Sequence, residues 1–194
     1  MSRGDTIVGM GQLTPLLERL GALVHQCVRD DAARHGLLPI HVLVLGYLAR
    51  ANRYSDLPIA IAEYFGITRG TVSQTLSVLE RRGLLTKARD PAHGRRVHLR
   101  LTPQGLAILG GSWTERVQAA LCAEPASAQL DETLVDVLAA LQRINGRRAF
   151  GVCSQCAHFR ADAGGTHCGL TGEPLAAEQT GKICREWTAP IPTD

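Results

Sequence analysis

The sequence predicts a mainly α-helical fold with one small β-hairpin, followed by a small, irregular, Cys-rich module at the C-terminus. Three observations support this prediction. Through most of residues 1–146, aliphatic residues recur every three or four positions, the period of an amphipathic helix. Two short runs, 84–88 and 96–101, flank a turn-rich loop, as the strands of a hairpin do. Four of the six cysteines lie after residue 150, so residues 147–194 are expected to form the separate module.

Composition limits the classes of protein that the chain can belong to. Its 194 residues allow one domain and a small appendage, and a hydrophobic content of 45% excludes wholesale disorder. The longest apolar stretch, 37–49, is too short to cross a membrane and is interrupted by polar residues and proline. The N-terminus has no charged region feeding an apolar run. We therefore expect a cytoplasmic protein with no membrane partner.

The first helices are marked by leucine and valine spacing and by proline. Residues 13–28 carry these residues at offsets of three and four, and Pro15 suits a first helical turn. Residues 39–50 are apolar nearly all round, which predicts a buried helix.

A denser unit follows in the chain. Two helices are expected over 57–65 and 71–82, joined by a turn at 67–70, and the two strands come next. A further helix begins at Thr102-Pro103 and runs through Leu109, with a continuation to Leu121 left open. The last helix covers 131–144.

Two short helices, a glycine-containing turn and a basic hairpin together describe a winged helix-turn-helix, in which the second helix enters the DNA major groove. The net charge of +3 is weak, but residues 81–100 hold seven Lys or Arg residues against one acid. Gln can pair with adenine and Arg with guanine, while hydroxyls and Arg can hold phosphates. The predicted DNA contacts are Thr68, Arg69, Thr71, Ser73, Gln74, Thr75, Ser77, Arg81, Arg89, Arg95 and Arg96.

Residues 57–109 resemble the multiple-antibiotic-resistance (MarR) regulators. The resemblance rests on five segments in order: Ile67 to Ser73, Leu79 to Leu84, Arg89 to Pro91, Gly94 to Arg96 and Leu101 to Gly105. It implies a homodimer on a roughly palindromic operator, usually a repressor, with dimerisation helices at 13–28 and 131–144. In one departure, His93 stands where the family often has an acid that braces the wing arginine. Whether Asp90 takes that part is left open.

Four cysteines, Cys153, Cys156, Cys168 and Cys184, form the second candidate site. Without an export signal they indicate a metal or cluster site rather than disulfides. Zinc ribbons usually present two Cys-x-x-Cys knuckles, and this chain has one, which fits a four-cysteine iron–sulfur cluster at least as well. Zinc and free or disulfide-forming thiols remain alternatives. His158 or His167 could replace one cysteine, although exposed loop positions are the favoured interpretation.

The module also resembles the cluster-binding half of the high-potential iron–sulfur proteins. It shares with them one Cys-x-x-Cys, two spaced single cysteines, a Gly-rich connection and Trp187 three residues after the last cysteine. This resemblance implies a 4Fe–4S cluster walled from water by Phe159, Leu170, Leu175 and Trp187. The shorter first-to-third cysteine spacing would leave the cluster closer to solvent, which suits a sensor.

The remaining cysteines, Cys27 and Cys122, fall in predicted helices, where packing is the expected role. A redox role for Cys27 near the dimer interface is the alternative.

No nucleophile–base–acid constellation is visible in the sequence, so we do not expect an enzyme. The leading hypothesis is a dimeric, sequence-specific DNA-binding transcription regulator. Its iron–sulfur cluster would sense redox state, iron, oxygen or nitric oxide and act through the helix at 131–144. One alternative is a regulator that binds a small aromatic effector between the dimer helices and the DNA-binding part, with structural zinc. Another is an electron-transfer or metal-storage module fused to a DNA-tethering domain.

Overall fold

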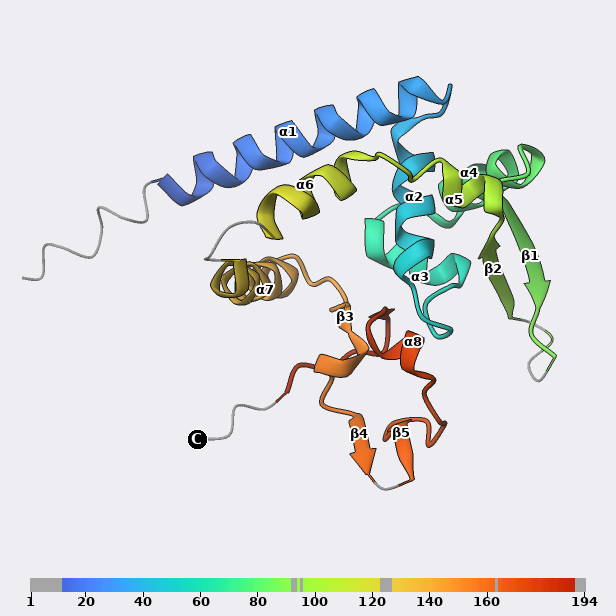
Figure 1. Cartoon of the computed structure of the whole chain (residues 1–194), viewed down its shortest axis with the longest axis vertical. Helices are drawn as coiled ribbons and strands as arrows, with labels where there is room; N and C mark the ends of the chain where they lie inside the picture. Colours follow the sequence, from blue (N-terminus) through green and yellow to red (C-terminus); the bar gives the residue numbers. More distant parts are fainter. Residues whose placement is uncertain (1–11, 92–93, 95, 123–126, 163, 191–194) are drawn as a thin grey trace, which may run out of the picture.

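The computed structural model describes residues 12–91, 94, 96–122, 127–162 and 164–190 (Figure 1). The described residues form a helical arm, a winged-helix lobe that ends in a β-hairpin, and a small module below both. The mainly helical fold with a small hairpin is confirmed. No single helix of the described ranges is both long and apolar enough to cross a membrane. The helices at Leu13–Arg34 and Pro39–Arg50 would be so only together, and they are bent by 97° at the break between them.

The helical arm begins with α1 (Leu13–Arg34), which is longer than the predicted 13–28. Its added turns bury Asp31, whose carboxylate accepts a hydrogen bond of 2.7 Å from the backbone N–H of Trp113. A polar residue therefore ties the end of α1 to the start of α6 (Trp113–Cys122). A search for apolar spacing misses that extension because the contact is a hydrogen bond.

The centre of the lobe is α2 (Pro39–Arg50), whose bounds were predicted correctly. Val44, Leu45 and Tyr47 are completely buried in it. The Tyr47 hydroxyl donates to the carbonyl of Ser55 at 2.9 Å, which satisfies the polar end of a buried ring. The helix therefore serves as the support on which the helix-turn-helix and the hairpin pack.

The helix-turn-helix consists of α3 (Pro58–Phe65) and α4 (Arg69–Arg81). Gly66 ends α3 in the left-handed conformation, with φ 64°, which glycine adopts without strain. Thr68 caps α4 by accepting a hydrogen bond from the backbone N–H of Thr71 at 3.1 Å. This cap makes α4 begin two residues earlier than predicted.

The hairpin, or wing, pairs β1 (Leu85–Arg89) with β2 (Val97–Leu101) in antiparallel register, with Leu85 opposite Leu101. The chain then enters α5 (Pro103–Ala107). The continuous helix left open by the sequence does not form, because the chain turns at Gly111, with φ 65°, before α6 begins. The arm is completed by α7 (Ser127–Ile144), which starts before the predicted residue 131.

The C-terminal module is more regular than predicted. It contains β3 (Gly151–Val152), a 3-10 turn η2 (Cys153–Gln155), β4 (Phe159–Asp162), β5 (Gly165–Cys168), α8 (Ala177–Thr180) and β6 (Ile183–Cys184). β3 pairs with β6, and β4 pairs with β5. Phe150 is buried in the core of the winged-helix lobe, and Ile183 packs against that core. The module is therefore packed onto the lobe that precedes it.

Candidate functional site

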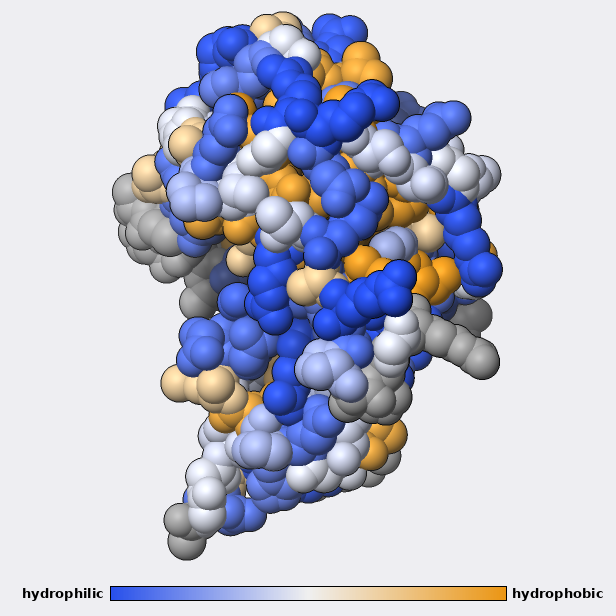
Figure 2. Space-filling model, turned by 90° about the vertical axis from the view of Figure 1, so that its right-hand side faces the viewer, coloured by the Kyte–Doolittle hydropathy of each residue, from blue (hydrophilic) through white to orange (hydrophobic). Residues whose placement is uncertain are grey.

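The exposed side of α4 presents the first part of the candidate DNA-binding surface. Thr68, Arg69, Thr71, Ser73 and Gln74 are exposed. They follow one another over the first turns of the helix, which is the part that reads base edges in helix-turn-helix proteins. Figure 2 views the molecule from the side of α4 and the wing, where hydrophilic side chains gather.

Two predicted contacts on α4 need revision. Thr75 was expected to face outward, but it is only 4% exposed and packs inward on the same side as Val72 and Leu79. Thr75 lies three residues after Val72 and four before Leu79, which is the spacing of one helix face. Ser77 is half-buried, and its hydroxyl donates to the carbonyl of Ser73 at 2.9 Å.

The predicted arginines differ in their surroundings. Arg81, Arg89 and Arg96 are exposed and available to a phosphate backbone, while Arg95, like His93, lies outside the described residues. Other cations of the basic stretch serve the fold. Lys87 pairs with Glu80 at 2.6 Å, and the guanidinium of Arg82 donates to two backbone carbonyls at the α1–α2 turn.

The wing is held to the lobe by His98, a residue that the sequence analysis did not single out. Its Nδ1 lies 2.6 Å from an Asp56 carboxylate oxygen, and its Nε2 lies 3.3 Å from one of Asp90. The backbone N–H of Leu99 donates to the Asp56 carbonyl at 2.8 Å. Asp90, considered above as a brace for a wing arginine, thus contacts His98. No sequence pattern marks this triad, because Asp56 precedes His98 by 42 residues in the chain.

Protonation of His98 strengthens this brace. Burial disfavours the charged ring, but hydrogen bonds to Asp56 and Asp90 outweigh it and raise the pKa of His98 above its ordinary 6.5. Burial likewise raises the pKa of Asp56, against the opposing influence of His98 and Arg100. The ion pairs are only slightly accessible to solvent.

We expect the stability of the protein to fall as pH rises through the folded-state pKa of His98. Because that pKa is raised, its stabilisation is complete below 6.5 and is lost above the folded-state value. Denaturant unfolding between about pH 6 and pH 9 checks this, with His98→Gln as the comparison. The difference in the free energy of unfolding between the native protein and His98→Gln should shrink at high pH. A constant difference between the two proteins would contradict the proposed contribution.

The four cysteines line one small pocket inside the module. Each is positioned by a different part of the module. Cys153 opens η2, Cys156 follows it, Cys168 ends β5 and Cys184 ends β6. Strand pairing sets Gly151 opposite Cys184 and Phe159 opposite Cys168, which brings the segments together. All four predicted ligands are therefore brought to one place.

The environment of the thiols suits a soft metal centre. Burial, with a contribution from the other three cysteines, raises the pKa of Cys153 to about 11, so an isolated thiol there stays protonated at neutral pH. A bound cation would supply the missing positive charge. The sulfur of Cys156 accepts N–H donation from His158 and Thr188 at 3.5 and 3.4 Å. Hydrogen bonds to ligand sulfurs are one means by which a protein tunes a bound centre.

The spacing of the thiols bears on the kind of centre. Among the described residues, no group of three His, Cys, Asp or Glu side chains is arranged to hold a single metal ion. Tetrahedral zinc requires four ligands within about 2.3 Å of one point. The four cysteines nevertheless line one pocket.

The predicted wall of the pocket is partly present. Leu175 is buried, and Phe159 and Trp187 pack against the buried cysteines. Leu170, by contrast, is 52% exposed and shields nothing, because it lies in the turn after β5. His158 lines the pocket.

His167 is the other histidine considered as a ligand. Its Nδ1 lies 3.6 Å from an Asp162 carboxylate oxygen, and it does not line the cysteine pocket. The remaining cysteines divide as follows: Cys27 is half-buried and free, and the side chain of Cys122 lies outside the described residues.

Polar contacts dock the module on the winged-helix lobe, and the sequence analysis missed them. The Arg185 guanidinium makes two hydrogen bonds to the Glu63 carboxylate in α3, at 2.6 and 2.9 Å. Arg53, between α2 and α3, pairs with Glu173 at 2.8 Å, and its backbone N–H donates to Oε1 of Gln179 at 3.0 Å. The module therefore contacts the helix-turn-helix directly, in addition to following α7 in the chain.

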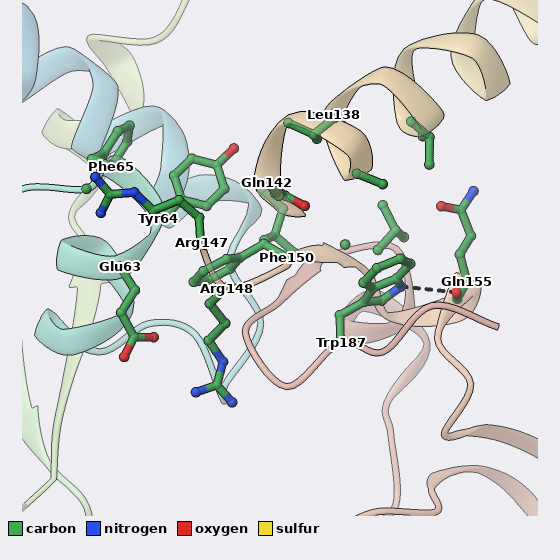
Figure 3. A pocket seen from close by; sticks show the side chains of 16 residues that line it. Glu63, Tyr64, Phe65, Leu138, Gln142, Arg147, Arg148, Phe150, Gln155 and Trp187 are labelled. Carbon is green, nitrogen blue, oxygen red and sulfur yellow. Dashed lines mark hydrogen bonds between the residues drawn. The ribbon is translucent and has the colours of Figure 1, made fainter. Parts of the chain in front are cut away.

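A second pocket lies between α3, α7 and the module (Figure 3). Its walls include Tyr64, Phe65, Leu138, Phe150 and Trp187. Figure 3 shows the Trp187 ring N–H donating to the Gln155 carbonyl, at 3.0 Å. The apolar and aromatic lining suits a small aromatic molecule, the effector considered from the sequence.

Fold and surface define a winged helix-turn-helix DNA-binding protein. The model of the MarR family matches residues 35–96, from before α2 to the wing. Over these residues the lobe is similar in sequence to the MarR family. No curated protein matches the chain significantly.

Solved structures share the fold at low sequence identity. MepR of S. aureus in its DNA-binding conformation matches with a TM-score of 0.57 and 23% identity, over 66% of this chain and 98% of MepR. A MepR–DNA complex matches with a TM-score of 0.53 and 22% identity, over 66% and 97%. The transcriptional regulator BldR from Sulfolobus solfataricus gives 0.55 and 18%, over 71% and 99%.

Proposed function

We propose that the protein is a homodimeric repressor that binds operator DNA and is controlled by an iron–sulfur cluster held by Cys153, Cys156, Cys168 and Cys184. The observation that carries the proposal is the meeting of four thiols in one pocket of a module docked on the DNA-binding lobe. A 4Fe–4S cluster would supply reversible electron transfer and sensitivity to oxidants there. A reducing cytoplasm would keep the thiols available.

The dimer is supported by the unpartnered apolar side of the helical arm. Large aliphatic side chains are exposed on all three of its helices, and an apolar patch of this kind is unusual on a surface that stays in water. They are Leu13, Leu16, Leu20, Leu23, Val24, Val117, Leu121, Leu130, Leu134, Val135, Leu138, Leu141 and Ile144. A second copy of the chain would cover them and hold two α4 helices for two half-sites of an operator.

Docking of the module suggests a route of control that differs from the one expected through 131–144. Arg185 follows the ligand Cys184 directly and is clamped to Glu63 on the first helix of the helix-turn-helix. A displacement of Cys184 on binding or losing a cluster would therefore move its neighbour Arg185, which is bonded to α3. The expected signals remain iron, oxygen, nitric oxide and redox state.

DNA binding of metal-loaded and metal-free protein tests the proposal. An operator sequence is first selected from random duplexes with anaerobically purified protein, whose iron, acid-labile sulfide and zinc are measured. We expect iron and sulfide, and operator affinity that changes when both are removed. Stoichiometric zinc without sulfide, or equal affinity in both states, would contradict cluster control.

A matched pair of arginine variants tests the DNA-binding surface. Arg69→Ala removes an exposed cation from α4 and should weaken operator binding by about 1–3 kcal/mol if Arg69 contacts a base. Arg19→Ala removes the same charge from the exposed side of α1 and should leave operator affinity nearly unchanged. Equal losses in both variants would contradict a specific role for α4.

The alternative with a small aromatic effector is favoured by one observation, the aromatic pocket between α3, α7 and the module. If this alternative holds, a small aromatic ligand would change the operator affinity of protein whose cysteines hold zinc and no cluster. An electron-transfer module would instead show a reversible couple without any influence on DNA binding.

A further inference from the structure

We infer that Tyr54, a residue of the DNA-binding lobe, closes the cysteine pocket and shields its thiols, and the metal centre they hold, from solvent. The site in the module is then complete only while the module is docked on the lobe. The inference rests on one part of the proposed function, namely that the four cysteines hold a metal centre. Tyr54 belongs to the loop between α2 and α3, well before the module in the chain.

Tyr54 forms part of the pocket wall. It lines the pocket together with the four cysteines, and it packs against the buried group made by Cys153, Leu175 and Cys184. Among the described residues that line this pocket, all the others belong to the module. The sequence assigned a place in the wall to Leu170, which is exposed and does not line the pocket. Tyr54 therefore supplies, from outside the module, cover that Leu170 does not give.

The hydroxyl of Tyr54 is held by the segment that follows Cys168. It donates to the Glu173 carboxylate at 2.6 Å and lies 3.1 Å from the hydroxyl oxygen of Thr171. The backbone N–H of Cys168 donates to the carbonyl of the same Glu173 at 2.9 Å. Glu173 thus orients Tyr54 with its side chain and a predicted metal ligand with its backbone.

Arg53 adds a charged contact that keeps the ring in place. Its guanidinium carbon lies 5.1 Å from the centroid of the Tyr54 ring, and one of its nitrogens donates to the Tyr54 hydroxyl at 2.9 Å. The same nitrogen donates to the Glu173 carboxylate at 2.8 Å. Tyr54 cannot leave the pocket without breaking these contacts, which are of the charge-assisted kind.

The loop that carries Tyr54 is fixed to the lobe on its other side. The carbonyl of Ser55 accepts from the hydroxyl of Tyr47 in the core, and the carbonyl of Asp56 accepts from the backbone N–H of Leu99 on β2. Undocking of the module would withdraw Tyr54 from the pocket and open the centre to water, oxidants and chelators, because the apolar surroundings of a metal site control access to it. Tyr54 is therefore a positioning and shielding residue, not a ligand.

Labelling of the thiols in reduced, metal-free protein tests the wall directly. N-ethylmaleimide, a small thiol reagent, is applied to the native protein and to Tyr54→Ala, and mass spectrometry follows Cys153 and Cys184 separately. Cys27 in α1 is the internal reference for an intact fold. In a second measurement, both proteins are loaded with iron and sulfide or with zinc, whichever the native protein holds, and the rate at which a chelator removes the metal is recorded.

Leu170→Ala is the matched control. Leu170 lies close to Cys168 in the chain, yet its side chain is exposed and outside the pocket. This variant should show the native rates in both measurements.

In Tyr54→Ala we expect labelling of Cys153 and Cys184, and removal of the metal, to be about 10-fold faster, a size common when a contact around a metal site is lost. Cys27 should be labelled at its native rate. If Tyr54→Ala does not fold, Tyr54→Leu decides, since it keeps an apolar side chain on the loop and removes the ring and its hydroxyl. Native rates in the folded Tyr54 variant, or the same increase in Leu170→Ala, would overturn the inference.

The two measurements separate this inference from the proposed function. Zinc without sulfide in the native protein would contradict the cluster, while faster zinc loss from Tyr54→Ala would still support the wall. Iron and sulfide lost at the native rate from Tyr54→Ala would overturn the inference and leave the cluster standing. A native protein that holds neither metal would contradict the proposed function, and the labelling rates would then decide whether Tyr54 closes the pocket.

Discussion

Replacing Cys184 with serine should yield a protein that assembles no iron–sulfur cluster and binds its operator equally well with or without iron and sulfide. Cys184 is buried and lines the pocket together with the other three cysteines. A serine hydroxyl is a hard donor that replaces thiolate poorly at soft metals. Iron and sulfide analysis, visible absorption and operator affinity of anaerobically purified protein provide the measurement.

Cys27→Ser is the control for this experiment. Cys27 lies in α1, far along the chain from the module, and is half-buried. This variant should keep the native iron content and operator affinity. A Cys184→Ser protein with unchanged iron and sulfide would show that Cys184 is not a ligand. Loss of stoichiometric zinc from that variant, with no sulfide in the native protein, would favour the structural zinc alternative.

Gly105→Ala should destabilise the whole winged-helix lobe by about 3 kcal/mol or more, at the upper end of the range for overpacking. Gly105 is buried at the start of α5, and a Cβ there would lie 2.0 Å from the carbonyl oxygen of Leu84. That oxygen belongs to the backbone just before β1 and accepts from the N–H of Thr102, so it has little freedom to move. Denaturant unfolding measures the loss.

Gly21→Ala is the matched glycine. It lies in α1, where an added Cβ meets nothing within 4 Å. In a helix interior this change should raise stability by about 0.5–1 kcal/mol. Equal effects of the two substitutions would show that the close approach of Gly105 to Leu84 does not limit the fold.

Helix ends marked by a first-turn proline or a closing glycine were the easiest part of the fold to predict from sequence. Pro39 and Pro58 at first turns and Gly66 after α3 placed three boundaries at or within one residue of those observed. These residues act locally, through a fixed φ or access to positive φ, so their meaning does not depend on distant contacts. The continuation past Leu109 was left open, although the Gly110-Gly111 pair is a local turn signal that marks the break.

The face of α4 shows a limit of judging residues by polarity. Thr75 was predicted to contact DNA because it carries a hydroxyl, yet its spacing from Val72 and Leu79 places it in the core. The spacing was available in the sequence and was the better guide. The choice of Ser73 and Gln74 agrees with both criteria, and both residues are exposed.

The sequence by itself determined the helix-turn-helix, the wing and the residue types of both candidate sites, because periodicity, caps and cysteine spacing are local properties. Only the tertiary structure brought the four cysteines to one pocket, Arg185 onto Glu63 and His98 between Asp56 and Asp90. Those partners come from segments that no repeat or motif relates. The contact of Arg185 with Glu63 follows from how the module packs on the lobe, since Phe150 and Ile183 pack against its core. The His98 contacts follow from how the wing folds back on the loop before α3.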